Sequence, residues 1–292
     1  MTRFLLATTA LVSFIATAAA ADLGATKVAA VGLPAMSGDI VAYAGFTRLT
    51  DDYDSDYSFS PSVIGGAGRV NIWLAPQWST QFDLNAERDS GRAVGSTYSD
   101  TSINLAGHAS WRSNGFLLGA MASIGSDNDD SWNGRFATGA LEGQATFGNF
   151  QLYAQGGFTD SLSIDNYSFV TARYIRGEAR YFATPNLMLA ANLGYVHETY
   201  DSSGPLKATT WGADIEYKFD KSPVSIFASY QGSYTSEDPD ESGETWKTHT
   251  VLAGVKFSFG DQTLQSAAVS GATLRDYNPI SGYSRLRYNN WE

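Results

Sequence analysis

The feature that most constrains this chain is a strict two-residue alternation in segments of about ten residues or more, long enough to cross a bilayer as tilted strands. The segment Ser99 to Trp111 shows the alternation most cleanly. One phase holds Thr101, Ile103, Leu105, Gly107, Ala109 and Trp111, and the other holds Ser102, Asn104, Ala106, His108 and Ser110. Successive side chains of a β-strand point to opposite faces, so this period predicts a strand.

Similar segments recur from Asp39 to Phe259, about twelve in all, and the connections between them alternate in length. Short turns are expected at 75–77, 112–115, 148–149, 184–186 and 220–223, and longer polar loops at 51–57, 88–98, 125–133, 159–168, 201–207 and 236–244. An even number of strands joined by alternately short and long connections is typical of bacterial outer-membrane barrels. The sequence therefore predicts an all-β fold, a closed up-and-down antiparallel transmembrane β-barrel with both chain ends in the periplasm.

The distribution of charge separates this prediction from a soluble β-sandwich, which also shows alternation. Charged residues are 17% of the chain, below the roughly 25% of ordinary soluble domains. On several strands they gather on one phase, as at Arg176, Glu178 and Arg180. In a membrane barrel that phase faces a wet or hydrogen-bonded lumen, while the apolar phase faces lipid. Arg173 and His249 fall on the lipid phase, near the expected long-loop rim.

Aromatic residues gather where the predicted strands meet the short turns. The set comprises Trp73, Trp78, Trp111, Phe116, Phe147, Phe150, Tyr181, Phe182, Phe219, Phe257 and Phe259. A ring of such side chains at one height is typical of the interfacial girdle of a membrane barrel.

The two ends of the chain differ from the alternating part. Arg3, an apolar stretch from Phe4 to Ile15 and the small residues Ala16 to Ala21 predict a secretory signal peptide over residues 1–21. We expect a periplasmic lead over 22–36, the barrel over 37–259 and a periplasmic tail over 260–292. For the tail, three roles remain open: a plug in the lumen, a contact with a periplasmic partner, or disorder.

Three stretches carry a family resemblance: the Ala20-Ala21-Asp22-Leu23 junction, Thr184-Pro185-Asn186-Leu187, and the last strand, Leu252 to Phe259. On these the chain resembles Gram-negative outer-membrane β-barrel proteins, in particular the porin-like barrels of alphaproteobacteria. The resemblance implies a place in the cell outer membrane, contact with lipid and lipopolysaccharide, and assembly by the barrel-assembly machinery through a terminal aromatic strand. The residues after Phe259 depart from that pattern.

The charged or titratable side chains on the inward phase are the candidate pore-lining residues. They are Arg69, Asp83, Glu87, His108, Glu142, Arg176, Glu178, Arg180, Asp214, Glu216 and Lys218. They favour a porin-like channel for passive diffusion of small polar solutes. The alternative is a structural or surface-interaction barrel in which these groups pair and block the lumen.

A third hypothesis, an outer-membrane hydrolase, rests on His108, which shares a face with Asn104 and Ser110. On its own strand no carboxylate orients His108, so we interpret it as a structural residue and expect no enzyme activity.

Composition excludes several other functions. The net charge is -11 with only 19 Lys and Arg residues, which argues against nucleic acid as a partner. The chain has no cysteine, so disulfides and thiolate metal sites are excluded. Acidic runs at 51–56, 127–130 and 237–241 have a spacing that can hold calcium, but the first lacks the glycine and distal glutamate of an EF-hand loop. Solvated loop tips are the favoured interpretation, so neither a metal nor a cofactor is expected. The oligomeric state is not indicated.

Overall fold

The computed structural model describes residues 35–51, 58–93, 96–113, 115–129, 133–164, 170–200, 205–237 and 245–277. The predicted signal peptide, nearly all of the lead, most of the acidic run at 51–56 and the tail from residue 278 lie outside the described residues.

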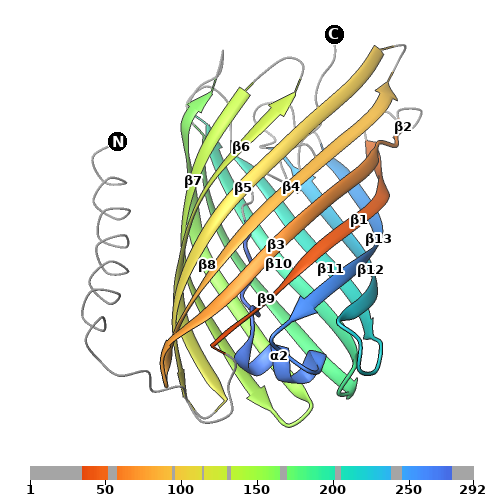
Figure 1. The fold of residues 1–292 in the computed structure, drawn as a ribbon. Helices are drawn as coiled ribbons and strands as arrows, with labels where there is room; N and C mark the ends of the chain where they lie inside the picture. The colour runs from red at the N-terminus through yellow and green to blue at the C-terminus, as the bar shows by residue number, and fades with distance from the viewer. Residues whose placement is uncertain are drawn as a thin grey trace.

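Twelve long strands and one two-residue strand make up the sheet of the described chain (Figure 1). They are β1 (Met36–Asp51), β2 (Ser58–Phe59), β3 (Ser62–Ala75), β4 (Trp78–Ala93), β5 (Ser96–Ser113), β6 (Phe116–Asp129), β7 (Asn133–Phe147), β8 (Phe150–Ile164), β9 (Val170–Thr184), β10 (Leu187–Tyr200), β11 (Leu206–Lys218), β12 (Val224–Ser236) and β13 (Thr245–Phe259). The short strand β2 pairs only with the end of β1.

The sheet closes on itself. Each long strand pairs antiparallel with the next along the chain, and β13 pairs with β1 from Gly38↔Phe259 to Asp51↔Trp246. Closure leaves no unpaired edge among the long strands, as a sheet in hydrocarbon requires. The predicted up-and-down barrel is confirmed, and so is the strand number.

The two faces of the sheet are inverted relative to a soluble protein. Large apolar side chains point outward, with Leu141 73% exposed and Ile175 64% exposed. Polar side chains such as Gln81 and Gln151 point inward and are fully buried. An apolar outer surface of this extent is stable only when lipid covers it.

Three of the predicted long loops are mostly strand. Strand β4 continues to Ala93 and β5 begins at Ser96, while β6 continues to Asp129 and β7 begins at Asn133. Strand β8 likewise runs to Ile164. The prediction of loops at 88–98, 125–133 and 159–168 was therefore too broad. Polar side chains are compatible with strand structure in these segments. The strands extend beyond the apolar band, where water rather than lipid contacts their outer face.

The aromatic girdle is present at the short-turn end, but two of its predicted members are not part of it. Phe116 and Phe147 meet edge to face at 6.2 Å, and Phe150 lies 4.7 Å from Tyr181 between ring centroids. All four rings are exposed on the outer face. Trp73 and Phe182 instead share the inward phase of Asn71 and Arg180, and both contact the chain that follows β13.

After β13 the chain turns back toward the lumen. Gly260 has a φ of 86°, and the short helix α2 (Leu264–Ser270) follows at the short-turn end of the barrel (Figure 1). Thr263 and Ser266 form a reciprocal capping box at its start. Within the described chain no helix has the length and apolar character to span a bilayer. We refer to residues 261–277 as the C-terminal segment.

Candidate functional site

The structure places all eleven candidate residues on the inward face of the barrel. Seven of them are buried: Asp83, His108, Glu142, Glu178, Arg180, Glu216 and Lys218. Arg69, Glu87, Arg176 and Asp214 are partly exposed to the lumen. Their inward position follows from the two-residue alternation, whereas their partners depend on strand register.

His108 sits between two carboxylates supplied by other strands. Its Nδ1 lies 2.8 Å from Glu142 Oε1 on β7, and its Nε2 lies 3.3 Å from Asp83 Oδ2 on β4. Tyr153 donates a hydrogen bond of 2.8 Å to the other oxygen of Glu142. Both carboxylates come from other strands, so the sequence of the His108 strand alone did not indicate them. Ser110 is not a hydrogen-bond partner of His108, because its hydroxyl is hydrogen-bonded to the Ser79 hydroxyl at 2.9 Å.

A second cluster centres on Glu178 of β9. Arg180 Nε lies 2.5 Å from Glu178 Oε1, and Arg176 Nη2 lies 3.4 Å from Oε2. Arg275, from the C-terminal segment, contacts both oxygens of the same carboxylate, at 2.9 Å and 3.3 Å. Three guanidinium groups thus surround one buried carboxylate, and one of the three does not come from the barrel wall.

The helix α2 is attached to the wall through its C-terminal carbonyl groups. Arg112 donates to the carbonyls of Val269 at 2.8 Å and Gly271 at 3.1 Å. The wall amides and indole complete the set: Gln144 and Gln151 donate to Ala268 O, and Asn71 and Trp73 donate to Ser270 O. The last carbonyls of a helix have no intrahelical partner and carry its negative dipole end, so a cationic and amide-rich wall stabilises them.

The residues after α2 are also held by wall side chains, one after another. Arg180 donates to both oxygens of Thr273. Gln81 both donates to and accepts from the backbone of Leu274, at 3.0 Å and 3.2 Å.

The next two residues continue this pattern. Asp276 accepts from Asn85 at 2.8 Å and from Asn104 at 2.6 Å. Tyr277 packs against Tyr174 with ring centroids 4.9 Å apart.

These contacts place residues 264–277 inside the lumen. The sequence predicts a periplasmic tail over residues 260–292 and leaves a plug in the lumen open among its roles. Of the three roles left open for the tail, the described part has the contacts of a plug. The physical reason is that the wall offers a row of buried amides and guanidinium groups, which the C-terminal segment satisfies.

Besides its polar groups, the inward face of the barrel carries an apolar cluster. Met121, Phe136, Val196, Leu206 and Trp246 form a buried cluster there, and Tyr277 packs against it. Polar side chains such as Asp127, Glu198 and Thr235 are also buried on the inward face, near the long-loop ends of their strands.

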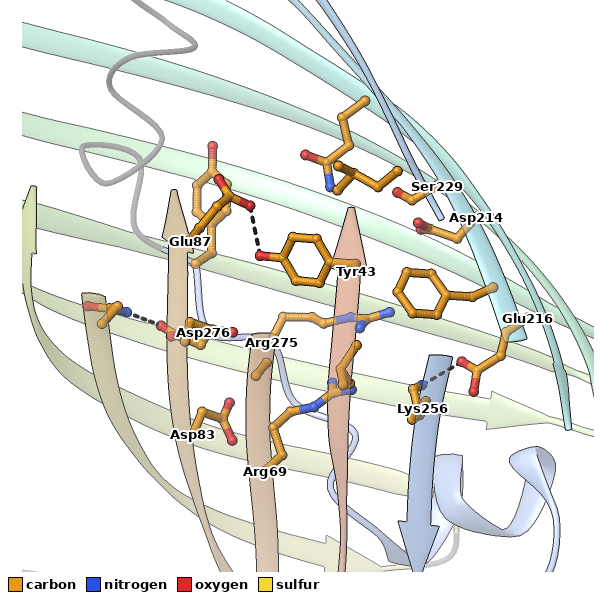
Figure 2. Close-up of a pocket in the computed structure, with 18 of the residues that line it drawn as sticks. Tyr43, Arg69, Asp83, Glu87, Asp214, Glu216, Ser229, Lys256, Arg275 and Asp276 are labelled. Atoms are coloured by element: carbon orange, nitrogen blue, oxygen red, sulfur yellow. Dashed lines mark hydrogen bonds and ion pairs between the residues drawn. The ribbon is translucent and has the colours of Figure 1, made fainter. Parts of the chain in front are cut away.

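Beside the C-terminal segment, a cavity of about 390 Å³ remains in the lumen. We call it the lumen cavity. It is bounded by β1, β3, β4 and β5 on one side, by β10 to β13 on the other, and by Arg275, Asp276 and Tyr277. Figure 2 shows Lys256 pointing toward Glu216, with 2.5 Å between Nζ and Oε2, and Asp214 beside Ser229. Among the described residues, no group of three His, Asp or Glu side chains is arranged to hold a metal ion.

Several functional residues were not identified from the sequence. The C-terminal residues Arg275, Asp276 and Tyr277 lie in the lumen, as do the wall residues Lys256 and Arg112. Lys256 and Arg112 share the inward phase of their strands and were detectable by the alternation itself. For the tail, the only local signal was the capping box Thr263-x-x-Ser266, which indicates a helix start but not its location.

Comparison with known proteins supports the fold. No family model and no curated protein matches the chain. Among solved structures, an outer-membrane channel from Pseudomonas putida F1 is similar over 80% of this chain and 99% of its own, with a TM-score of 0.59 at 14% identity. The translocator domain of the autotransporter NalP from Neisseria meningitidis is similar over 88% and 98%, with a TM-score of 0.53 at 12% identity.

The β-domain of a Bordetella autotransporter, BrkA, is similar over 76% of this chain and 100% of its own, with a TM-score of 0.52 at 15% identity. At these identities the likeness concerns the fold alone, and it does not single out the alphaproteobacterial porin-like family. With its closed sheet, apolar exterior and polar interior, the chain is an outer-membrane β-barrel.

Proposed function

We propose that this protein is a narrow outer-membrane channel for small polar solutes, restricted by its own C-terminal segment. The observation that carries the proposal is the lumen cavity, a space of about 390 Å³ with both charged and apolar lining side chains that remains between the segment and the wall. Twelve strands enclose a lumen between the filled barrels of eight strands and the open porins of sixteen or more. One of the similar solved structures is itself described as an outer-membrane channel.

The wall chemistry supports passage of hydrophilic solutes through this space. Charged and amide side chains from β3, β4 and β11 line the lumen cavity, so a polar solute exchanges water for protein hydrogen bonds as it enters. On the outside, lipid would contact the apolar band and lipopolysaccharide would contact the strand ends beyond it. Assembly would proceed through the barrel-assembly machinery, with Phe257 and Phe259 as the aromatic end of the last strand.

Planar-bilayer recording on the purified, refolded full chain tests the proposal. We expect discrete conductance steps that are small for a barrel of this strand number, because the C-terminal segment fills much of the cross-section. Folding is checked first by the shift of the band between boiled and unboiled samples. A correctly folded barrel that gives no steps above the lipid baseline would contradict a channel.

A second candidate, a structural barrel with an occluded lumen, is favoured by the density of bonds between wall and segment. Each residue from Thr273 to Asp276 is bonded by at least one wall side chain. If this is the function, the full chain gives no conductance steps in planar bilayers. Deletion of the gene then weakens the envelope without changing its permeability to small solutes.

A hydrolase is not proposed. His108 is fully buried, and its two ring nitrogens face Asp83 and Glu142 rather than a hydroxyl. A histidine without access to substrate and without a nucleophile beside it has no role in acyl transfer. We therefore propose that His108 stabilises the wall.

A further inference from the structure

The lumen cavity carries an excess of acidic side chains. Its ionisable lining groups are five carboxylates, Asp83, Glu87, Asp214, Glu216 and Asp276, and three cations, Arg69, Lys256 and Arg275. If all of these groups are ionised, the carboxylates outnumber the cations and the lining of the cavity has a net negative charge. A cluster of acids often marks only a solvated surface, so the partners of each group decide what the cavity can bind.

Each of the three cations already has a carboxylate partner. Arg69 is paired with Asp39 at 3.0 Å, Lys256 with Glu216 at 2.5 Å, and Arg275 with Glu178 at 2.9 Å. Asp39 and Glu178 do not line the lumen cavity, so two of the three positive charges are balanced from outside it. Asp83 lies 3.3 Å from the His108 ring, whereas Asp214 and Asp276 have no ion-pair partner among the described residues.

Asp214 is the carboxylate with the least compensation. It has no hydrogen bond or ion pair with any residue that the structure describes. Asp276 accepts only from the neutral amides of Asn85 and Asn104, and Glu87 accepts from the Tyr43 hydroxyl at 2.7 Å.

Polar atoms with no hydrogen-bond partner among the described residues lie in the same cavity. They are Ser229 Oγ and Glu216 Oε1, on residues that are 6% and 5% exposed. Ser229 is the direct cross-strand partner of Asp214, and Glu216 lies two residues from Asp214 on the same face of β11. Figure 2 shows Asp214 and Ser229 next to each other at the cavity wall. A buried polar group without a partner is costly, so this corner of the cavity favours a ligand that donates hydrogen bonds.

We propose that the lumen cavity binds the primary ammonium group of a small organic cation. An ammonium carries one positive charge and three N–H donors, and Asp214, Glu216 Oε1 and Ser229 Oγ supply oxygen acceptors on two adjacent strands. The apolar side chains of Phe227 and Leu252 also line the cavity and would contact a short alkyl chain. The inference names a ligand class for the proposed channel, and it rests on that function only for the route by which the ligand arrives.

Isothermal titration calorimetry on the folded full chain in detergent tests the inference without any conductance measurement. The probes are butylamine, butan-1-ol and butyrate, which share one alkyl chain and differ in the head group. We expect saturable binding of the butylammonium ion only. A charge-assisted hydrogen bond supports a change of about tenfold or more, so D214N should weaken butylammonium binding at least tenfold.

Two further variants make the result specific. D220N removes the same charge at the exposed β11–β12 turn, where Asp220 accepts from Asn186 at 2.8 Å, and it should leave the affinity unchanged. S229A keeps every charge and removes one oxygen, and it should weaken binding by about threefold to tenfold. It also serves as the test if D214N fails to give a heat-modifiable band.

Equal binding of butan-1-ol, or an unchanged affinity in D214N and S229A, would overturn the ammonium site. So would a loss in D220N as large as the loss in D214N, because binding would then follow overall charge. Failure of the proposed function is a separate result: a barrel that binds butylammonium but gives no conductance steps keeps the site and loses the channel.

Discussion

Arg275 of the C-terminal segment forms a two-point contact with Glu178 of β9, with Nη2–Oε1 at 2.9 Å and Nε–Oε2 at 3.3 Å. Glu178 is buried, and the contact joins residues 97 positions apart in the chain. It holds the C-terminal segment against the barrel wall through a residue that also lines the lumen cavity. The behaviour of the segment should therefore depend on this pair.

Replacement of Arg275 with Ala should loosen the C-terminal segment. Hydrogen bonds to charged groups contribute about 1.5–3 kcal/mol, so the ratio of bound to released segment should fall by about tenfold or more. Glu178 keeps Arg176 and Arg180 as partners, so the barrel itself should remain folded. Time-averaged conductance in planar bilayers measures the change, and it should rise. Arg173→Ala, which removes the same charge from the outer face, is the control; equal effects of the two variants would argue against the contact.

A side chain at Gly260 should disturb the entry of the C-terminal segment into the lumen. Gly260 has a φ of 86°, and an added Cβ would lie 2.5 Å from Met36 O and 2.6 Å from Ser37 Cα. Gly148 has a φ of 58° but no atom within 4 Å of the same position. Both Gly→Ala variants incur the cost of a left-handed residue, about 1–2 kcal/mol, and only Gly260→Ala adds a backbone clash. Urea unfolding in micelles should show the larger loss for Gly260→Ala. An equal loss of unfolding free energy in Gly148→Ala would show that the clash at Gly260 has no effect on stability.

Removal of the His108 imidazole should destabilise the wall. Asp83 and Glu142 would face each other without the ring between them, and breaking a buried charged cluster in this way costs about 3–5 kcal/mol. His108→Ala should lower the free energy of unfolding by about that amount, measured by urea titration. His108→Gln, which keeps one donor, should lose less. A loss below 1 kcal/mol in His108→Ala would show that the two carboxylates are not held by the ring.

An arginine at the outer waist should impair membrane insertion according to its depth. Leu141 is 73% exposed near the middle of β7, and Leu162 is 44% exposed two residues before the end of β8. Arg at the bilayer midplane costs about 2–4 kcal/mol and near the interface about 0–1 kcal/mol. Folding into vesicles under urea titration should therefore show a larger loss for Leu141→Arg than for Leu162→Arg. Equal losses would indicate that the outer waist does not face hydrocarbon.

The fold followed from the sequence because a single rule, the alternation of side chains, acts on every strand independently. Leu141 and Glu142 differ by one position, and that difference alone places one in lipid and the other beside His108. The same rule assigned Trp73 and Phe182 to the inner face, but their position near the short turns suggested the girdle. Proximity to an interface does not override strand phase.

The site followed only in part, since alternation gives direction and not neighbours. The Glu142–His108–Asp83 cluster needs the registers of β4, β5, β6 and β7, which depend on turn geometry between distant segments. The sequence of the C-terminal segment gave even less indication of where the segment lies. Many of its bonds to the wall involve backbone atoms, as at Leu274 with Gln81, and any residue type presents the same backbone groups.

The most direct test of the central claim, that the C-terminal segment restricts the lumen, is the single-channel conductance of the full chain beside a chain that ends at Phe259. Both proteins should show the band shift of a folded barrel in unboiled samples. We predict a severalfold larger conductance for the truncated chain, because the groups that now hold residues 264–277 would face open water. Equal conductance in two folded barrels would contradict the claim.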